Sequence, residues 1–416
     1  MTQPLRIGGI PAESLARRHG TPLIVLDLDL VRTRIAELRA ACDPYGISIS
    51  YAGKAFLTVA FARLIESLGI GLDVCSMGEL AIAERAVVPA KRLTFHGAGK
   101  DEDELHAVAA GRTGRIIVDG IDELCELDRI ARSRTGRTRI DVVLRLNTGV
   151  EAHAHEFVRT AGDRTKFGFD QEYENEAIAI LRSSPALELS GLHGHIGSQI
   201  DLVEPFGLNV ARLMEAAGRF TTAGFPIRTM VAGGGFGIDS AGGPALAATA
   251  VAKALHEESA AAAARLGIPE PALEIEPGRV IVAGAGTTLY RVMTVKRRSS
   301  RTFVIVDGGM ADNPRPALYG AHHDVFADGV DGPMETMTVC GRSCENDEMV
   351  EMPLPAAIGR GTLLAMTTTG AYTYSMASNY NRFFRPAVVG VEGGGERVLA
   401  RRETLDDLLS LDVAER

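Results

Sequence analysis

The sequence predicts an α/β fold, a TIM-type (β/α)8 barrel followed by an all-β domain. Eight short apolar, β-branched runs recur over about 230 residues, and stretches with helical spacing of apolar residues separate them. Nearly every run ends in a polar, ionisable or glycine-rich segment, as expected for barrel strands whose carboxyl ends carry an active site. After Arg279 the helical spacing fades, and short alternating runs appear between glycines and prolines.

The apolar runs are the predicted barrel strands. In chain order they are Ile47–Tyr51, Leu72–Val74, Leu93–Phe95, Ile116–Val118, Val142–Leu146, Leu189–Leu192, Met230–Val231 and Leu273–Ile275. Within or directly after them stand Lys54, Asp73–Cys75, His96, Asp119, Arg145–Asn147, His193 with His195, Gly233–Gly235 and Glu276. In this fold phosphate binds near the loops after strands seven and eight. Gly233–Gly235 and Glu276-Pro277-Gly278-Arg279 fall at those two places, which predicts a phosphorylated cofactor.

Further elements follow from the same spacing. A helix is expected over Asp29–Ala41, and before it a strand over Pro22–Leu26 with no helix ahead of it. Between strands five and six we expect a loop over Val150–Phe169, which at this end of a barrel commonly forms an active-site lid or wall, and then a helix over Glu172–Arg182. The alanine-rich stretch Ala245–Leu266 predicts the helix before strand eight.

Six short alternating runs predict the all-β domain. They are Leu289–Val295, Phe303–Val306, Met337–Cys340, Leu363–Met366, Ala387–Val391 and Arg397–Arg401, and a short helix is expected over Glu403–Asp412. The early run Pro22–Leu26 can join this sheet. We therefore expect residues 29–277 to form the barrel, and residues 1–28 with 278–416 to form the β-domain.

Composition excludes several classes of protein. The 416 residues suggest two domains, and 46% hydrophobic with 23% charged residues is ordinary for a globular chain. A net charge of −9 without a basic block argues against nucleic acid or an anionic membrane as partner. Five cysteines without a CxxC pair indicate reduced thiols, and no run approaches the roughly 20 apolar residues of a membrane span. Since the amino terminus lacks the pattern of a secretory signal, we expect a cytoplasmic protein.

Lys54 ends the first barrel strand. An ammonium group in a closed barrel mouth is costly unless it is paired or chemically modified, and a lysine with a lowered pKa forms Schiff bases with carbonyl cofactors. A structural salt bridge is the ordinary interpretation of an isolated lysine, but the neighbouring anion site and Glu276 favour a covalent cofactor. Glu276 itself can keep a pyridine nitrogen protonated and so make the ring an electron sink. Its alternative is a strand-end carboxylate paired with Arg279, and both can hold together.

The segment His193–Ser198 ends strand six. The flat imidazole of His195 can lie against an aromatic ring, and Ser198 can donate to a phosphate. The glycine-rich loop Gly233–Gly237 offers backbone N–H groups that suit the same phosphate. The pairs His193/His195 and His153/His155 have a spacing seen in metal sites, but no cysteine or carboxylate at ligand spacing completes either pair, so no metal is predicted. Cys344 beside Glu345 can donate a proton, although an inert cysteine in a turn is the ordinary interpretation.

Together these segments resemble the fold-type III pyridoxal-phosphate-dependent decarboxylases, and among them most closely those that act on diaminopimelate. The resemblance covers essentially the whole chain. Its motifs stand in the family's order: TPLIVLD, YAGKA, HGHIGSQ, GGGFGID, EPGR, GGMADNPRPALYGA, SCE, TGAYTYSMASNYN and RRETLDDLL. RPALYG and the Glu156–Gly168 loop are closer to the diaminopimelate enzymes than to ornithine or arginine decarboxylases. The resemblance implies an alanine racemase-like fold and pyridoxal 5'-phosphate as cofactor.

The resemblance also implies roles for single residues. Lys54 would hold the cofactor covalently, His195 would stack on its ring, and Glu276 would bind the ring nitrogen. Other implied cofactor contacts are Asp73 and, at the phosphate, Ser198, Gly235, Gly278 and Tyr372. Implied substrate contacts are Arg279, Arg315 and Tyr319 at the distal carboxylate, Glu345 at the distal amino group, and Tyr372. Cys344 would be the proton donor, and Cys344 and Glu345 would reach into a second subunit, so the active unit would be a homodimer.

The sequence departs from the usual family pattern in places. Gly53 stands where leucine or valine is usual, and Met77 where glycine is usual. After Cys344, the run Asn346–Glu348 replaces Ser-Gly-Asp, and Arg342 replaces a proline or lysine. The last two departures lie in the substrate-specificity loop and leave the exact amino acid open.

The implied reaction is decarboxylation of meso-2,6-diaminopimelate to L-lysine and CO₂, a lyase step of lysine biosynthesis. Cys344 would protonate the carbon from which CO₂ departs. One alternative is a decarboxylase of ornithine, lysine or a carrier-bound amino acid on the same fold. A racemase would favour arginine at the position of Glu276. A non-catalytic regulator that binds a partner protein would tend to lose Lys54, the phosphate loop or Cys344.

Overall fold

The computed structural model describes residues 4–134, 138–150 and 165–413. The chain divides into two compact units, and each is described by itself below. The barrel unit comprises Ile35–Gly237 and Pro244–Gly278. The sheet unit comprises Met1–Arg34, Ile238–Gly243 and Arg279–Arg416.

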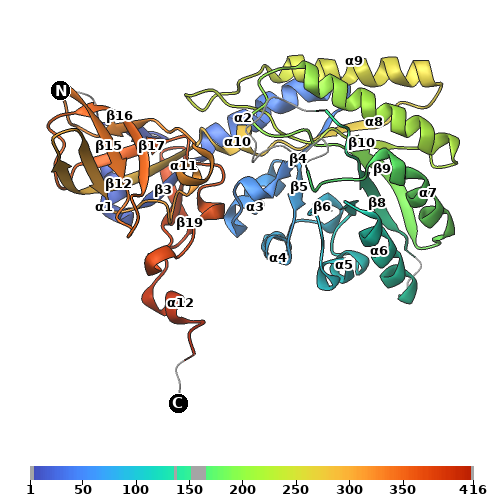
Figure 1. Ribbon diagram of the computed structural model, residues 1–416, viewed down its shortest axis with the longest axis horizontal. Coiled ribbons are helices and arrows are strands. Elements are labelled where there is room, and N and C mark those ends of the chain that lie inside the picture. Colours follow the sequence, from blue (N-terminus) through green and yellow to red (C-terminus); the bar gives the residue numbers. More distant parts are fainter. Residues whose placement is uncertain (1–3, 135–137, 151–164, 414–416) are drawn as a thin grey trace. The chain divides into compact units, whose positions relative to one another are not determined.

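The barrel unit is a closed barrel of eight parallel strands, as predicted (Figure 1). All eight predicted strands are present. They are β4 (Ser48–Ala52), β5 (Gly71–Val74), β6 (Leu93–Phe95), β7 (Arg115–Val118), β8 (Ile140–Arg145), β9 (Leu187–His193), β10 (Thr229–Val231) and β11 (Ala272–Ile275). The barrel closes between β11 and β4, where Glu274 is in register with Ser48. Because all strands run parallel, their carboxyl ends meet at one mouth.

Helices separate the strands and surround them (Figure 1). They are α2 (Leu28–Cys42), α3 (Val59–Ser67), α4 (Met77–Arg85), α5 (Glu102–Ala109), α6 (Ile121–Ser133), α7 (Glu174–Ser183), α8 (Glu204–Thr222) and α9 (Ala248–Leu266). The start of α3 shows how the sequence fixes them: the Thr58 side chain accepts the N–H of Phe61, and Phe61 and Leu64 are buried. The predicted helices near residues 29–41, 172–182 and 245–266 are therefore confirmed, with ends shifted by up to three residues. Residues 151–164 of the expected loop lie outside the described residues.

The sheet unit contains a mainly antiparallel sheet in the order β16-β15-β13-β12-β3-β18-β19, with β17 pairing β12 and β14. Its strands are β3 (Leu23–Asp27), β12 (Gly286–Arg297), β13 (Thr302–Val306), β14 (Val325–Ala327), β15 (Met334–Cys340), β16 (Glu348–Pro355), β17 (Leu363–Thr367), β18 (Ala387–Glu392) and β19 (Gly395–Ala400). All six predicted runs are strands, and β3 lies between β12 and β18. The early strand therefore joins the later sheet, as expected.

Short elements complete the sheet unit. They are the hairpin β1 (Arg6–Ile7) and β2 (Ile10–Pro11) and the helices α1 (Ala12–His19), α10 (Arg279–Val282), α11 (Arg315–Tyr319) and α12 (Leu405–Leu409). The expectation that no helix precedes the first strand is wrong, because α1 does. Its residues Ala12, Leu15 and Ala16 have helical spacing and are buried.

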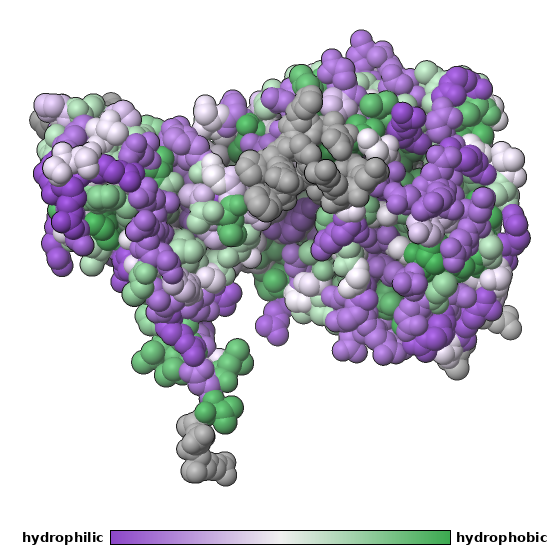
Figure 2. Space-filling model, in the orientation of Figure 1, coloured by the Kyte–Doolittle hydropathy of each residue, from purple (hydrophilic) through white to green (hydrophobic). Residues whose placement is uncertain are grey.

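Hydrophilic residues dominate the face of the barrel unit seen in Figure 2. In the part of the chain that the structure describes, no helix is both long enough and apolar enough to cross a membrane.

Several apolar side chains on and after α12 are exposed, among them Leu405 at 61% and Leu411 at 90%. Exposed apolar groups so close together in sequence commonly mark a surface that a partner covers.

Candidate active site

The mouth of the barrel unit is built from residues that directly follow the strands. Lys54 lies in the short turn Gly53–Ala55 after β4, and its side chain is exposed. Among the described residues, no hydrogen bond or ion pair engages its amino group. A Cβ at Gly53 would lie only 2.6 Å from the carbonyl oxygen of Asp73, so the close packing of this turn on β5 requires glycine. The departure from the family's leucine or valine at Gly53 therefore has a steric reason.

The glycine-rich loop after β10 packs against the segments that follow β9 and β11. A Cβ at Gly234 would lie 2.1 Å from the carbonyl oxygen of Glu276, and one at Gly235 would lie 2.4 Å from that of Gly197. The backbone of Gly235 is also left-handed, with φ of 94°. Within the described chain, the N–H groups of Gly235 and Gly278 meet no hydrogen-bond acceptor. Backbone donors of this kind suit a phosphate group.

His195 presents an uncharged ring to this mouth. Its Nδ1 accepts the N–H of Gly234 at 3.1 Å, so Nε2 carries the proton. Burial holds the pKa of His195 well below its usual range, and the nearby positive charges of Lys54 and Arg145 add to this effect. A neutral imidazole can lie flat against an aromatic ring without bringing a charge. Ser198 follows three residues later, half-buried, in the turn that Gly235 contacts.

Glu276 lies at the centre of a buried polar network that also contains two histidines. Nε2 of His193 is 3.1 Å from Oε2 of Glu276, and Nε2 of His96 is 3.1 Å from Oε1. His96 also lies 3.6 Å from Oδ1 of Asp73, whose second neighbour is the donating hydroxyl of Ser50 at 2.5 Å. Sequence reasoning assigned no role to His96 or His193, although their positions directly after β6 and at the end of β9 were a usable signal.

The network separates the charge states of its members. Burial acts to raise the pKa of Glu276, but the interactions with His96 and His193 outweigh it and hold this pKa well below its usual range. Burial lowers the pKa of His96, yet Glu276 and Asp73 reverse the effect and raise it to about 9. Burial dominates at His193 and lowers its pKa to about 4, while burial and Glu276 raise the pKa of Asp73. At neutral pH the site therefore holds an ionised Glu276, a charged His96 and a neutral His193.

These residues fit pyridoxal phosphate. Oε1 of Glu276 is buried, and its contact with Nε2 of His96 at 3.1 Å lacks hydrogen-bond geometry, so this oxygen can accept a hydrogen bond from a protonated ring nitrogen. The N–H groups of Gly235 and Gly278 can donate to the phosphate oxygens, and the free amino group of Lys54 is available for the carbonyl carbon. The nitrogen and oxygen atoms through which His96, His193 and Glu276 could bind a metal ion lie within 4.8 Å of one another. The sequence offered no carboxylate at metal-ligand spacing from His193, and in the structure Glu276, from the segment after β11, lies beside it.

In the sheet unit, aromatic rings and guanidinium groups come together. The guanidinium carbon of Arg279 lies 4.9 Å from the ring centre of Tyr372, and that of Arg315 lies 5.7 Å from the same ring and 5.8 Å from the ring of Tyr319. Burial and the charge of Arg279 lower the pKa of Arg315 to about 10. Among the described residues no carboxylate pairs with Arg315. Two neighbouring guanidinium groups of this kind suit an incoming carboxylate.

Cys344 and Glu345 lie on the loop between β15 and β16 of the sheet unit. The N–H of Cys344 donates to Oδ1 of Asn381 at 2.9 Å, and the hydroxyl of Tyr380 donates to Oε1 of Glu345 at 2.7 Å. Both loop residues are exposed. Their hydrogen bonds thus go to the turn around Tyr380 rather than to the arginine cluster. Sequence reasoning did not identify Tyr380 or Asn381 as supports of this loop.

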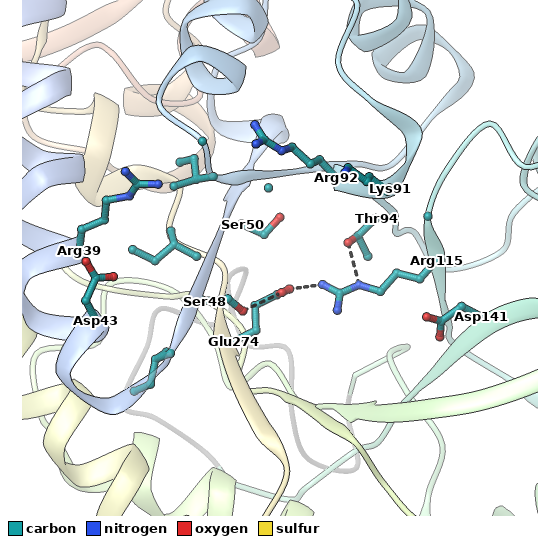
Figure 3. A pocket seen from close by; sticks show the side chains of 16 residues that line it. Arg39, Asp43, Ser48, Ser50, Lys91, Arg92, Thr94, Arg115, Asp141 and Glu274 are labelled. Carbon is teal, nitrogen blue, oxygen red and sulfur yellow. Dashed lines mark hydrogen bonds and ion pairs between the residues drawn. The ribbon is translucent and has the colours of Figure 1, made fainter.

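A cavity of about 410 Å³ lies at the opposite end of the barrel from the mouth, where the strands begin (Figure 3). Its lining includes an ion pair between Arg115 and Glu274. Thr94 accepts from Nε of Arg115 at 2.9 Å, and the hydroxyl of Ser48 donates to Glu274 at 3.1 Å. Because these charges are paired with one another, the cavity floor is a structural network of the barrel end that commonly serves stability.

Comparisons with known proteins agree with this site. Residues 28–283 match the model of the pyridoxal binding domain of pyridoxal-dependent decarboxylases. The chain is 43% identical to a diaminopimelate decarboxylase of Mycobacterium tuberculosis, over 98% of this chain and 94% of that protein. It is 40% identical to that of Bacillus subtilis, over 98% and 95%. A solved structure of diaminopimelate decarboxylase from M. jannaschii in complex with L-lysine superposes with a TM-score of 0.90 at 30% identity, over 98% of this chain and 95% of that one.

The match extends over both units. A family model that covers more than half of the chain, and relatives of this identity over nearly its full length, leave one assignment. The chain belongs to the diaminopimelate decarboxylases of the pyridoxal-dependent decarboxylase family.

Proposed function

We propose that this protein decarboxylates meso-2,6-diaminopimelate to L-lysine and CO₂ with pyridoxal 5'-phosphate as cofactor, in lysine biosynthesis. The observation that carries the choice of substrate is the arginine cluster of the sheet unit. Arg315 has no carboxylate partner among the described residues and lies beside Arg279. An anionic group bound at this arginine cluster would balance the two positive charges. Diaminopimelate has a second carboxylate to offer, whereas lysine and ornithine do not.

In this proposal the barrel, residues 29–277, binds the cofactor. Bound pyridoxal phosphate supplies an aromatic ring that accepts the electron pair left behind when CO₂ departs. Lys54 would hold it covalently, and the N–H groups of Gly235 and Gly278, with Ser198 and Tyr372, would hold its phosphate. Glu276 would bind the ring nitrogen and keep it protonated. We assign the buried cluster around Glu276 to this task and not to a metal ion.

His195 and Asp73 complete the barrel site. The neutral ring of His195 would cover one face of the cofactor and exclude water from it. Asp73 supports Glu276 indirectly, because His96 contacts both carboxylates. Exclusion of water strengthens the electrostatic effect of Glu276 on the ring.

The sheet unit supplies the groups that bind and protonate the substrate. Arg279, Arg315 and Tyr319 bind the distal carboxylate, which fixes the orientation of the carboxylate that leaves, and Tyr372 also contacts the substrate. Cys344 donates a proton to the reacting carbon, and Glu345 binds the distal amino group. Residues 1–28 and 278–416 form the domain that carries them. The hydroxyl of Tyr380 and the amide of Asn381 hold the loop in place.

We propose a cytoplasmic homodimer in which Cys344 and Glu345 complete the site of the second subunit. Both residues are exposed on their loop. The side chains that hold this loop, Asn381 and Tyr380, do not belong to the arginine cluster. Apolar residues such as Leu405 and Leu409 are exposed in the same unit, and a second copy of the chain can cover them.

A panel of free diamino acids tests this function. The protein loaded with pyridoxal phosphate is assayed for CO₂ release from meso-diaminopimelate, L-lysine and L-ornithine. We expect kcat/KM for meso-diaminopimelate to exceed the other two by about 10³-fold or more, because an arginine left unpaired rejects a substrate without the second carboxylate. Strong preference for a substrate with one carboxylate would overturn the choice of substrate but not the decarboxylase. No CO₂ from any diamino acid would favour a non-catalytic protein.

A further inference from the structure

We propose that His96 is a positioning residue for the reaction: as an imidazolium between the carboxylates of Asp73 and Glu276, it keeps Glu276 ionised and holds it in the orientation that the cofactor ring needs. The inference rests on the proposed function, because that function assigns Glu276 to the ring nitrogen. His96 does not reach the substrate in this account. It acts through Glu276.

The contacts of His96 fix the ring in one place. The backbone N–H of His96 donates to the carbonyl oxygen of Val74 at 2.7 Å, which ties the residue after β6 to the end of β5. The ring packs edge-on against the ring of His193, with centroids 5.5 Å apart and planes at 74°. From this position Nε2 faces Glu276 at 3.1 Å and Asp73 at 3.6 Å. The contact to Glu276 is an ion pair without hydrogen-bond geometry, which leaves Oε1 able to accept another proton donor.

The two buried carboxylates of Asp73 and Glu276 need a cation between them, and His96 provides it. Two carboxylates buried beside each other repel, so one of them takes up a proton unless a cation lies between them. Arg145 on β8 is paired with Asp119 at 3.3 Å. Arg115 on β7 is paired with Glu274 of β11, the buried carboxylate two residues before Glu276. Neither arginine is therefore free to neutralise the pair.

The other charged and titratable groups near Asp73 and Glu276 do not supply this positive charge either. His193 on β9 and His195 after it have lowered pKa values and are neutral at pH 7. The positive charge of Lys54, after β4, acts to lower the pKa values of His195 and Cys75. A charged His96 therefore keeps Glu276 ionised to meet one protonated ring nitrogen, and the raised pKa of His96, about 9, agrees with this charge.

Two substitutions separate the positive charge of His96 from the presence of an N–H group at this position. His96→Gln keeps a donor but removes the positive charge, and His96→Lys keeps both. We expect His96→Gln to lower kcat by about tenfold or more with KM changed less than about threefold, since supports of this kind typically contribute a factor of 10 to 100. His96→Lys should recover part of the loss. His106→Gln, the same change at an exposed histidine on α5, is the control and should behave as wild type.

The charge of His96 can be read without turnover. In protein labelled with ¹⁵N-histidine and loaded with pyridoxal phosphate, the His96 signal is the one that either variant lacks. We expect the wild-type imidazole to be doubly protonated at pH 7.5. A neutral imidazole at that pH overturns the proposal whatever the variants do, and so does a His96→Gln enzyme with the kcat of wild type. If wild type releases no CO₂ while His96 is charged, the proposed function fails and the charge assignment stands. If His96→Gln does not fold, His96→Lys and the wild-type spectrum decide the matter.

Discussion

The carboxylate of Asp347 anchors the loop that carries Cys344 and Glu345. Its Oδ1 accepts the N–H of Met310 at 2.7 Å, and its backbone oxygen accepts the N–H of Gly341 at 2.8 Å. Asp347 is buried, and its backbone is left-handed with φ of 48°. The unusual run after Glu345 therefore has a structural task in shaping the loop.

The residue that most directly controls the electron sink is Glu276. We expect Glu276→Gln to retain the cofactor through its phosphate and Lys54 but to lose about 10²-fold or more in kcat, because a neutral amide cannot keep the ring nitrogen protonated. Steady-state kinetics and cofactor content check this. Glu274→Gln, two residues earlier in the chain and on β11, is the matched control. It breaks the ion pair with Arg115 and should lower stability while leaving the kcat of the folded protein unchanged. Near-normal turnover in Glu276→Gln would refute the role.

His96 predicts a pH dependence of folding stability. Its pKa is about 9 in the folded protein against 6.5 for the free side chain. The stabilisation from its pairing is therefore fully present below pH 6.5 and is lost as pH rises through 9. The expected size is on the order of 3 kcal/mol. Urea unfolding of cofactor-free wild type and His96→Gln should show a difference in unfolding free energy at pH 6 that shrinks by pH 9.5. A difference that is constant with pH would contradict this.

The strand ends could be predicted as chemically important, but the pairing among them could not. Lys54, His195 and Glu276 stand in segments whose sequence already indicates a task. His96 and His193 take theirs from Glu276, which lies 180 and 83 residues away along the chain. Such pairing depends on how a barrel closes, and β11 meets β4 through contacts that no local spacing reveals.

At the scale of elements, apolar runs predicted the barrel and most of the sheet, but β16 was missed. Its sequence, Glu348–Pro355, contains two prolines, which argue against a strand in the interior of a sheet. In the structure β16 stands at the end of the strand order, where a missing N–H is tolerated. The short β14 gave no signal, because three residues do not establish an alternation. The helix α12 is shorter than expected, since the Thr404 side chain caps it at Leu405.

The glycine loop after β10 allows a matched test of close approach. Gly235 and Gly224 have nearly equal backbone angles, with φ of 94° and 92°, but only at Gly235 would a Cβ meet another chain segment. We expect Gly235→Ala to raise the dissociation constant of pyridoxal phosphate about tenfold or more, because the loop must move off Gly197. Gly224→Ala should lower stability by about 1 kcal/mol and leave cofactor binding intact. Equal cofactor affinity in both variants would show that this loop does not hold the phosphate.

At the scale of the whole molecule, the proposed homodimer makes a prediction of its own. Lys54→Ala and Cys344→Ala are each expected to be inactive. When they are mixed in equal amounts and exchange subunits, half of the dimers are hybrids with one intact site, so about a quarter of wild-type activity should return. Exchange is verified with differently tagged subunits. A mixture that stays inactive after exchange would mean that one subunit supplies both residues of its own site.

The central claim is that the barrel site is built around Lys54 as the covalent anchor of pyridoxal phosphate, and borohydride reduction tests it most directly. The chain contains six lysines, so five of them serve as internal controls. After reduction of the loaded protein and digestion, peptide mass spectrometry should find one phosphopyridoxyl group, on Lys54. A label on another lysine, or no label at all in a protein that binds the cofactor, would contradict the account.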